Sequence, residues 1–376
     1  MILVGSVLLG GCGNGNSAAD GTRSVGRSSG AAERGSSKQL LNLYFWADYL
    51  APATLADFES QTGIKVSVSY YENNETLETR LLMGHSDFDI VAPTGPFFER
   101  QIKAGVYQAL DKSRLPNLKN LSPELLAKVA RYDPGNAHGV IYTWGTLGLG
   151  YNERKIKALM PDAPLDSWRL VFDPAVAARI APCGIDVLDA PAEMMRAVLA
   201  YLGRDPNSQE SADLAAAQAT LMKIRPYIHN INSVAYVADL ANGDICLAVG
   251  FNGEALRARE RARENGKDAI SYVVPKEGSV LWFDMLAIPN GAPNLESAYA
   301  FMNYMMAPRV IADISNALHY ANANTAALSL VNSSVRDDPG IYAPPALLEK
   351  LAPFLADSAQ QTRAATRMWQ AFKTGE

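Results

Sequence analysis

Aromatic residues stand beside carboxylates at three places just after, or within, an expected strand. These places are Trp46/Asp48/Tyr49, Phe251/Glu254 and Trp282/Phe283/Asp284. Glu193, near an expected helix start, and Tyr320 extend the set. A buried ammonium group needs carboxylate partners, because an unpaired charge in a low-dielectric site is very costly.

Aromatic faces complement the carboxylates in such a site. They suit the methylene groups of a ligand, and they attract a cation by roughly 0.5–2 kcal/mol per contact. Carboxylates combined with aromatic walls therefore predict a site for an α,ω-diamine. Core aromatics and surface acids that are scattered over a long chain remain the alternative explanation of the pattern.

Catalytic signatures are missing from the body of the chain. Residues 40–376 contain no Gly-x-Ser-x-Gly elbow, no Walker loop and no His-Glu-x-x-His. The glycine-rich stretch 145–150 has the wrong spacing for a nucleotide loop, and no Lys-Ser/Thr follows it. The four histidines are scattered, so no metal site or other cofactor is expected. An enzyme is the disfavoured interpretation.

Chain length and net charge further limit the possible classes of protein. A chain of 376 residues is too long for one simple core, so two lobes are expected. The formal charge of −5 and the lack of a basic run argue against nucleic-acid binding. Without residues 1–38 the body has 30 basic and 37 acidic residues, a balance that weakly favours cationic ligands.

The first residues have the character of an export signal. An apolar run over residues 1–11 ends at Cys12, and Leu9-Gly-Gly-Cys12 is typical of a lipobox, whose cysteine becomes lipid-modified. The run is too short to span a bilayer. An ordinary secretory signal with a chance cysteine is the alternative. Residues 13–37, rich in Gly, Ser, Ala and Asn, are predicted to be a flexible tether.

Strand and helix patterns alternate from residue 40 onward and predict a parallel sheet with covering helices. The first part has expected strands at 40–45, 64–68 and 88–92. Helices are expected from Pro52 to the cap Gly63 and over 76–83, the second capped by Asn73 and Asn74. Thr94 follows the strand 88–92, at the edge where open α/β sheets bind ligands. Further strands are expected at 140–144, 147–151, 181–188, 244–250 and 282–289, and helices at 192–202, 211–224, 295–306 and 309–318.

Two cysteines follow Cys12 in the sequence. Export to an oxidising compartment favours a disulfide between Cys183 and Cys246. Closing a loop of about 60 residues would contribute roughly 4 kcal/mol in the chain-entropy model. Two separate buried thiols are the alternative.

The body resembles the polyamine-binding proteins of ABC transporters, most of all the putrescine-binding branch. The resemblance spans residues 40–376 and rests on Trp46-Ala-Asp-Tyr-Leu-Ala-Pro52, Phe88-Asp-Ile-Val-Ala-Pro93, Leu188-Asp-Ala-Pro191, Leu240-Ala-Asn-Gly-Asp-Ile-Cys246, Trp282-Phe-Asp284 and Tyr320-Ala-Asn-Ala-Asn324. It implies a type II two-lobed periplasmic-binding fold of class α/β, in which each lobe is a mixed, mainly parallel sheet flanked by helices and the ligand lies in the interlobe cleft. It also implies the Cys183–Cys246 disulfide. The expected division is 39–141 plus 282–330 for lobe 1, and 142–281 plus 331–376 for lobe 2.

The resemblance also implies a set of ligand-binding residues. The aromatic box corresponds to Trp46, Tyr49, Trp282 and Tyr320, with Phe251 as a further wall. The acidic ligands correspond to Asp48, Glu193, Glu254 and Asp284, while Thr94 matches a serine of the family and Ala47 lies beside the box.

Some positions depart from the family pattern. Ala190 is typical of the putrescine branch, whereas Trp282 is typical of the spermidine branch. Phe251 replaces a tryptophan and Glu254 an aspartate, so one wall is smaller and one acid reaches further. Pro96 and Ala47 replace hydroxyl-bearing residues. These changes leave the exact amine open.

The leading hypothesis is a non-catalytic, monomeric periplasmic receptor, tethered to the membrane through lipidated Cys12. It would capture a polyamine, putrescine first and spermidine next, for an inner-membrane ABC permease with a separate ATPase. The alternatives are a sensor that has lost polyamine binding, and a receptor for another small cationic or amino-acid-like ligand.

Overall fold

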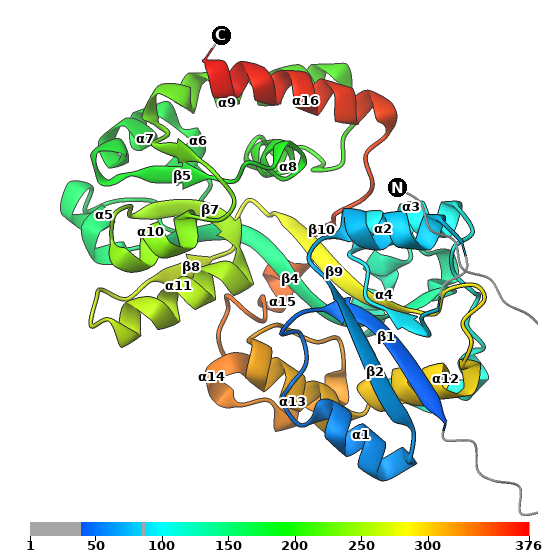
Figure 1. The fold of residues 1–376 in the computed structure, drawn as a ribbon. Helices are drawn as coiled ribbons and strands as arrows, with labels where there is room; N and C mark the ends of the chain where they lie inside the picture. The colour runs from blue at the N-terminus through cyan, green and yellow to red at the C-terminus, as the bar shows by residue number, and fades with distance from the viewer. Residues whose placement is uncertain (1–38, 85–86, 376) are drawn as a thin grey trace, which may run out of the picture. The chain divides into compact units, whose positions relative to one another are not determined.

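The computed structural model describes residues 39–84 and 87–375. The predicted signal run, the lipobox cysteine Cys12 and the tether lie outside these residues. The described residues fall in one compact unit of alternating strands and helices (Figure 1). None of the helices in this part of the chain is both long enough and apolar enough to cross a membrane.

The strands form one hydrogen-bonded network in the order β2-β1-β3-β9-β4-β7-β5-β6, with β10 beside β9 and β8 beside β4. Pairs β1–β2, β1–β3, β5–β6 and β5–β7 are parallel, whereas β9 and β4 run antiparallel to each other and to their other main partners. The strand bounds are β1 (Leu40–Trp46), β2 (Lys65–Tyr71), β3 (Ile90–Val91), β4 (Gly139–Tyr151), β5 (Ile185–Val187), β6 (Asn230–Ile231), β7 (Leu247–Phe251), β8 (Ser271–Val273), β9 (Val280–Ala287) and β10 (Ala352–Pro353).

Helices cover this network. The predicted caps Gly63 and Asn73 are present, although the second helix begins at Asn74, two residues before its predicted start. Gly63 ends the first helix with a φ of +72°, and the Asn73 side chain caps the second by accepting from the Thr76 N–H at 2.8 Å. The helix bounds are α1 (Thr54–Thr62), α2 (Asn74–Leu82), α3 (Gly95–Lys103), α4 (Pro123–Val129), α5 (Glu153–Leu159), α6 (Arg169–Phe172), α7 (Pro174–Ile180), α8 (Pro191–Tyr201), α9 (Ser211–Ile224), α10 (Tyr236–Asn242), α11 (Asn252–Glu264), α12 (Leu295–Met305), α13 (Pro308–Leu318), α14 (Ser333–Arg336), α15 (Pro345–Leu348) and α16 (Ala359–Thr374).

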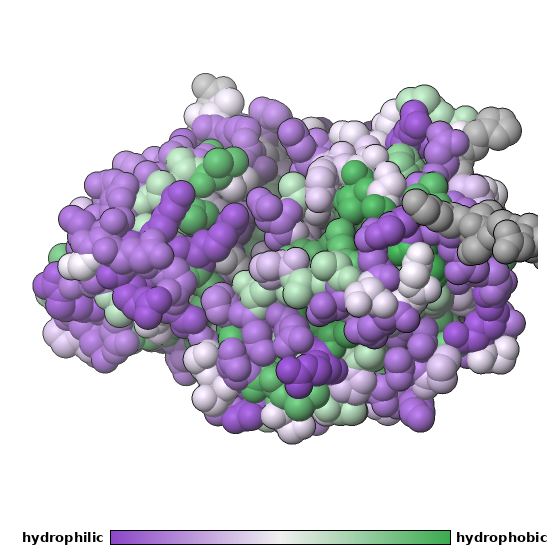
Figure 2. Space-filling view, turned by 60° about the horizontal axis from the view of Figure 1, so that its bottom comes forward, coloured by the Kyte–Doolittle hydropathy of each residue, from purple (hydrophilic) through white to green (hydrophobic). Residues whose placement is uncertain are grey.

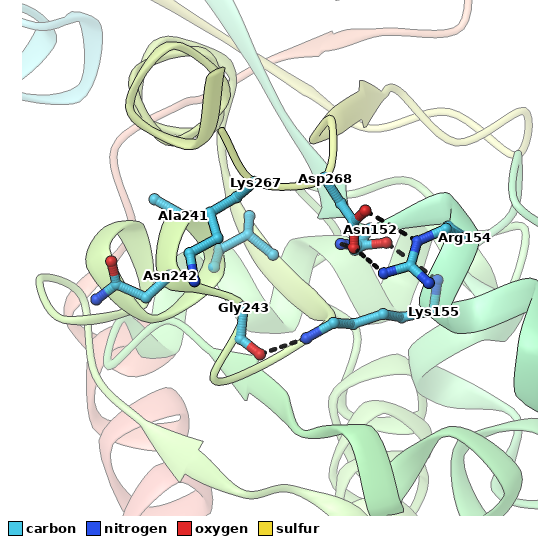
Figure 3. A pocket seen from close by; sticks show the side chains of 9 residues that line it. Asn152, Arg154, Lys155, Ala241, Asn242, Gly243, Lys267 and Asp268 are labelled. Atoms are coloured by element: carbon cyan, nitrogen blue, oxygen red, sulfur yellow. Dashed lines mark hydrogen bonds and ion pairs between the residues drawn. The ribbon is translucent and has the colours of Figure 1, made fainter. Parts of the chain in front are cut away.

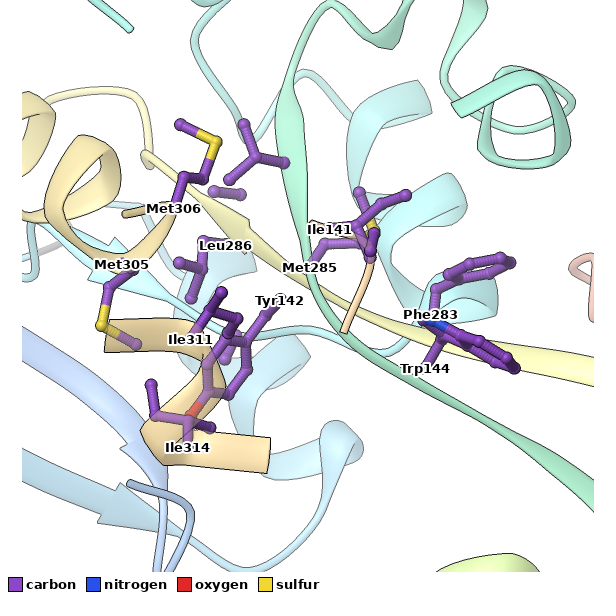
Figure 4. Close-up of a cluster of buried hydrophobic side chains, with 14 of the residues drawn as sticks. Ile141, Tyr142, Trp144, Phe283, Met285, Leu286, Met305, Met306, Ile311 and Ile314 are labelled. Carbon is purple, nitrogen blue, oxygen red and sulfur yellow. The ribbon is translucent and has the colours of Figure 1, made fainter. Parts of the chain in front are cut away.

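Two separate hydrophobic cores divide the unit into two lobes. The first lobe packs around residues such as Leu41, Phe45, Phe58, Tyr142 and Phe301. The second lobe packs around residues such as Trp168, Phe172, Leu221, Val249 and Phe372. Figure 4 shows part of the first core, where Trp144 and Phe283 lie side by side on the paired strands β4 and β9.

The long strand β4 connects the lobes. Its thirteen residues are all buried, and it pairs with β9 up to Thr146 and with β7 from Leu147 onward. The prediction of two separate strands here was wrong, because the chain changes its pairing partner without interrupting the strand. Strand β9 crosses in the same way, since Val280 packs in the second core and Leu281 in the first.

The C-terminal part of the predicted division differs from the observed packing. Val331, Val335, Ile341 and Leu351 are buried in the first core, although the stretch 331–376 was assigned to the second lobe. Helix α16 and Phe354 pack in the second core there.

The predicted disulfide is present. Cys183 and Cys246 are bonded, with their Cα atoms 5.6 Å apart. Each cysteine lies just before one of the neighbouring parallel strands β5 and β7, which brings the two together. The expected strand 181–188 is shorter than predicted, because residues 181–183 form a 3₁₀ turn and Gly184 has a φ of +88°.

Candidate functional site

A buried carboxylate, Asp284, is the centre of a hydrogen-bonded cluster in the first lobe. Asp284 lies in β9 and is 6% exposed. The Tyr49 hydroxyl donates to its Oδ2 at 2.5 Å, and the Thr94 hydroxyl donates to its Oδ1 at 2.7 Å. Thr143 is 2.7 Å from the Tyr49 hydroxyl, and the Asn74 amide donates to the Thr94 hydroxyl at 3.0 Å. Four elements of the first lobe therefore converge on one carboxylate.

Local backbone features bring these side chains together. After β1, Asp48 adopts a left-handed conformation with a φ of +53°, and the turn directs Tyr49 back toward the sheet. The Tyr142 hydroxyl fixes this turn by donating to the Tyr49 carbonyl oxygen. On β4 the register shifts between Ile141 and Thr143, so that Thr143 faces Asp284.

The charge of Asp284 has no counter-ion in residues 39–84 and 87–375. Burial raises the pKa of Asp284 to about 6, and the hydrogen bonds from Thr94 and Tyr49 offset only part of that rise. Burial and the neighbouring Asp284 also raise the pKa of Tyr49, so its hydroxyl stays a donor. A cation placed here would supply the missing charge.

Three aromatic rings lead from Asp284 toward the second lobe. The Tyr49 and Tyr320 ring centres are 5.8 Å apart, and those of Tyr320 and Trp282 are 5.2 Å apart at an interplanar angle of 87°. Burial raises the pKa of Tyr320 to about 12, with smaller upward effects from Glu254 and Asp284. Tyr320 thus lies within electrostatic reach of a carboxylate from each lobe.

The second lobe meets these rings at the first turn of α11. A Cβ atom on Gly253 would lie 2.2 Å from the Tyr320 ring, so only glycine allows this approach. The Glu254 carboxylate accepts from the Tyr236 hydroxyl and is 3.6 Å from Arg257. Burial raises the pKa of Glu254, while Tyr236 and Arg257 counteract that effect. Phe251, just before this turn, packs against the second core.

The remaining predicted residues have other partners or are exposed. Trp46 donates its indole N–H to the Ala92 carbonyl oxygen at 2.9 Å. Ala47 and Asp48 are exposed in the turn after β1. Glu193 is half-buried in the first turn of α8, where burial raises its pKa. Among the described residues, no hydrogen bond or ion pair joins Asp48 or Glu193 to the Asp284 cluster.

Four residues of the site were not predicted from the sequence. Asn74 orients Thr94, Thr143 contacts Tyr49, Tyr236 holds Glu254, and Asn252 lies at the start of α11. Asn74 stood out only as a possible helix cap. Thr143 gave no signal, because its role depends on the register shift in β4.

Two pockets are lined by residues outside the Asp284 cluster. One of about 230 Å³ in the second lobe is lined by Asn152, Arg154, Lys155, Leu240, Ala241, Asn242, Gly243, Lys267 and Asp268 (Figure 3). Another, of about 480 Å³, is lined by residues of the segments 124–131 and 349–353. In the first pocket Arg154 is bonded to Asp268 at 2.8 Å and Lys155 to the Gly243 carbonyl oxygen, so much of its charge is already satisfied. The unsatisfied charge of Asp284 makes its cluster in the first lobe, with the rings that lead from it toward the second lobe, the stronger candidate.

A fold of two lobes joined by β4 and β9, with a carboxylate and aromatic rings at their junction, defines a binding protein rather than an enzyme. Residues 53–344 match the family of bacterial extracellular solute-binding proteins. The chain belongs to this family, which confirms the predicted class and its extracytoplasmic location.

Comparison with relatives indicates which branch of the family this chain resembles. The chain is 45% identical to the putrescine-binding periplasmic protein SpuD of Pseudomonas aeruginosa, over 94% of this chain and 96% of the relative. It is 46% identical to the putrescine-binding periplasmic protein PotF of Escherichia coli, over 90% and 92%. The crystal structure of the spermidine/putrescine ABC transporter substrate-binding protein PotD from Streptococcus pneumoniae superposes with a TM-score of 0.82 at 28% identity, over 90% of this chain and 99% of that one. The predicted fold class and the resemblance to the putrescine-binding branch are therefore confirmed.

Proposed function

We propose that this protein captures a polyamine, putrescine in the first place, outside the cytoplasm and delivers it to an ABC importer. The observation that carries this proposal is Asp284, a buried carboxylate with hydroxyl donors but no counter-ion among the described residues. An ammonium group is the natural partner, because it supplies both the charge and the donors that the site lacks.

The aromatic rings suit the rest of such a ligand. Tyr49, Tyr320 and Trp282 provide apolar faces between Asp284 and the first turn of α11, where Glu254 supplies a second carboxylate. A diamine would place one ammonium group at Asp284, its methylene chain along the rings, and its other ammonium group toward Glu254. Asp48, Glu193, Trp46 and Phe251 complete the proposed set, and they reach the ligand once the lobes rearrange around it.

The partners follow from this role. A periplasmic receptor of this kind hands its ligand to an inner-membrane permease that is driven by a separate ATPase, and it works as a monomer. Lipidation of Cys12 would hold it at the membrane. Neither the lipid nor the permease is needed for the binding step, which can be tested on its own.

Calorimetric titration tests the proposal. The dialysed protein is titrated with putrescine, cadaverine, spermidine, spermine, agmatine and γ-aminobutyrate. We expect one-to-one binding, with putrescine tightest. A folded protein that binds none of the amines would refute the proposal and favour the sensor alternative, whereas a preference for γ-aminobutyrate would favour an amino-acid-like ligand.

Phe251 and Glu254, where this chain departs from the family pattern, provide a further test at the end of the site that the second lobe forms. Restoring the family residues with Phe251→Trp and Glu254→Asp should tighten diamine binding, because the aromatic wall grows and the acid shortens. Weaker diamine binding in this double variant would show that the native pair is adapted to another ligand.

A further inference from the structure

Two buried N–H donors lie without acceptors where the lobes meet. The Trp282 indole Nε1 and the Asn252 amide Nδ2 have no hydrogen-bond partner in the part of the chain that the structure describes. Asn252 is fully buried and Trp282 is 8% exposed. Buried donors are normally paired, and leaving one unpaired is expensive. Each therefore calls for an explanation.

The Trp282 and Asn252 side chains both pack against Gly145. Gly145 pairs with Trp282 across β4 and β9. A Cβ atom on Gly145 would lie 2.3 Å from the Asn252 Oδ1 and 2.3 Å from the Trp282 ring. Trp282 is buried but belongs to neither core. The two side chains that carry the donors are therefore neighbours at the junction of the lobes.

The amide of Asn252 has a defined orientation. Its Oδ1 accepts from the Thr146 backbone N–H at 3.3 Å. A flipped amide would place two donors against each other at that contact. The Nδ2 group must therefore face away from Thr146, and it remains a donor in need of an acceptor.

An ammonium group cannot satisfy these donors, because it carries no acceptor. Glu254, in the first turn of α11, acts electrostatically on Tyr320, whose ring contacts Trp282, and its carboxylate accepts hydrogen bonds. This end of the site therefore offers both donors and an acceptor. A group that contains both an N–H and a C=O matches such a set, since the N–H can bond Glu254 while the oxygen takes the two donors.

The carboxylates around the two donors disfavour an anionic acceptor and favour a neutral one. Asp284 is two residues from Trp282 on β9, so the two side chains lie on one face of the strand, about 7 Å apart along it. Glu254 and Asp284 both repel an anion. Arg257 offsets only part of this repulsion, because 69% of its side chain is exposed.

We propose that the second-lobe end of the site takes a neutral acceptor oxygen, so that the receptor binds mono-N-acyl diamines as well as diamines. The cationic end of such a ligand pairs with Asp284, and its amide oxygen accepts from Trp282 and Asn252. With a plain diamine, a water molecule supplies the same oxygen. This inference rests on the proposed function, because it assumes that a cation binds at Asp284.

Titration of the full chain with putrescine and with N-acetylputrescine tests the inference in three proteins. Trp282→Phe keeps a ring but removes one donor, and Asn252→Asp keeps the acceptor for Thr146 but removes the other. We expect wild type to bind both ligands. Each variant should lose about tenfold more affinity for N-acetylputrescine than for putrescine, relative to wild type.

The matched control is Trp168→Phe, which removes an indole N–H that already donates to the Gly278 carbonyl oxygen in the second core. It should leave the ratio of the two affinities unchanged. If putrescine binds but N-acetylputrescine does not, the inference fails while the proposed function stands. If N-acetylputrescine binds equally well to wild type and both variants, the donors are not used and the inference also fails. If neither ligand binds to folded wild type, the proposed function itself fails.

Crystal structures of the two complexes separate the two sources of the oxygen. An amide oxygen within hydrogen-bond distance of the Trp282 Nε1 in the N-acetylputrescine complex, and a water there in the putrescine complex, would support the inference. Absence of any oxygen near both donors in both complexes would overturn it.

Discussion

The two carboxylates at the ends of the site, Asp284 in the first lobe and Glu254 in the second, differ in what already neutralises them. Asp284 is bonded to two hydroxyls and has no cation near it in the described residues. Glu254 is bonded to one hydroxyl and also has Arg257 at 3.6 Å. Its side chain is 25% exposed, so water screens it further.

The difference identifies Asp284 as the stronger end for a cation. A charge that is buried among neutral donors costs free energy until a counter-ion arrives. Arg257 and water already offset part of this cost for Glu254. An ammonium group of the ligand therefore gains less free energy by binding there. The cluster around Asp284 consists of rigid elements of one lobe, whereas Glu254 approaches from the other lobe. We therefore expect a ligand to bind the first lobe before the lobes close.

The largest effect should come from Asp284→Asn. The substitution removes the charge and keeps the size, but it replaces one acceptor oxygen with an NH₂ donor. Putrescine binding should weaken by about 2–5 kcal/mol, because an ammonium group would remain buried without its counter-ion. Calorimetric titration measures the loss, and Asp57→Asn on exposed α1 serves as the control. Affinity equal to wild type would show that Asp284 is not the cation site.

The same substitution should stabilise the unliganded protein at neutral pH. The folded-state pKa of Asp284, about 6, is above its ordinary value of 3.8, so between these values the native state binds the extra proton. Stability therefore falls as pH rises through this window, and the cost is fully present above about pH 6. A pKa rise of about 2 corresponds to about 3 kcal/mol.

Urea unfolding of wild type and Asp284→Asn checks this prediction. At about pH 7.5 the variant should be more stable by up to about 3 kcal/mol, and the difference should disappear near pH 4. A variant that is less stable than wild type at both pH values would contradict the assigned cost. Ligand binding should weaken over the same window as pH falls, because a protonated Asp284 no longer attracts an ammonium group.

Glu254→Gln should have a smaller effect on binding than Asp284→Asn. We expect putrescine to bind about 1–2 kcal/mol more weakly, because the lost charge is already partly neutralised and partly hydrated. Titration of both variants at one ionic strength makes the comparison direct. A loss that equals or exceeds that of Asp284→Asn would reverse the order of the two ends.

The features that a local pattern carries could be predicted from the sequence. Helix α9 is found at the predicted residues, Gly63 and Asn73 act as caps, and the disulfide pairs the expected cysteines. The composition of a water-exposed globular protein also predicts a hydrophilic surface, and hydrophilic side chains predominate on the face in Figure 2. Tyr49 and Asp284 were predicted from the pattern of aromatics beside carboxylates, Thr94 from its place after a strand, and all three also from the resemblance. Their hydrogen bonds fit one site.

Long-range geometry could not be predicted. Thr143 reaches Tyr49 only because β4 shifts register against β9, and no local signal marks such a shift. Tyr236 and Asn252 contribute polar atoms whose partners are decided by how α10 and α11 pack. Asp48 and Glu193 remain predicted ligands, since their role depends on a ligand and on lobe movement.

Arg257→Gln gives the smallest expected effect and sharpens the comparison of the two carboxylates. Without Arg257, Glu254 would more closely resemble Asp284 in lacking a cation, so a diamine should bind slightly more tightly. The gain should be about 0.5 kcal/mol, since Arg257 is mostly exposed and exposed ion pairs contribute little. Titration at low and high salt measures it, with Arg261→Gln on the same helix as the control. Weaker binding in Arg257→Gln would show that Arg257 positions Glu254 for the ligand rather than competing with it.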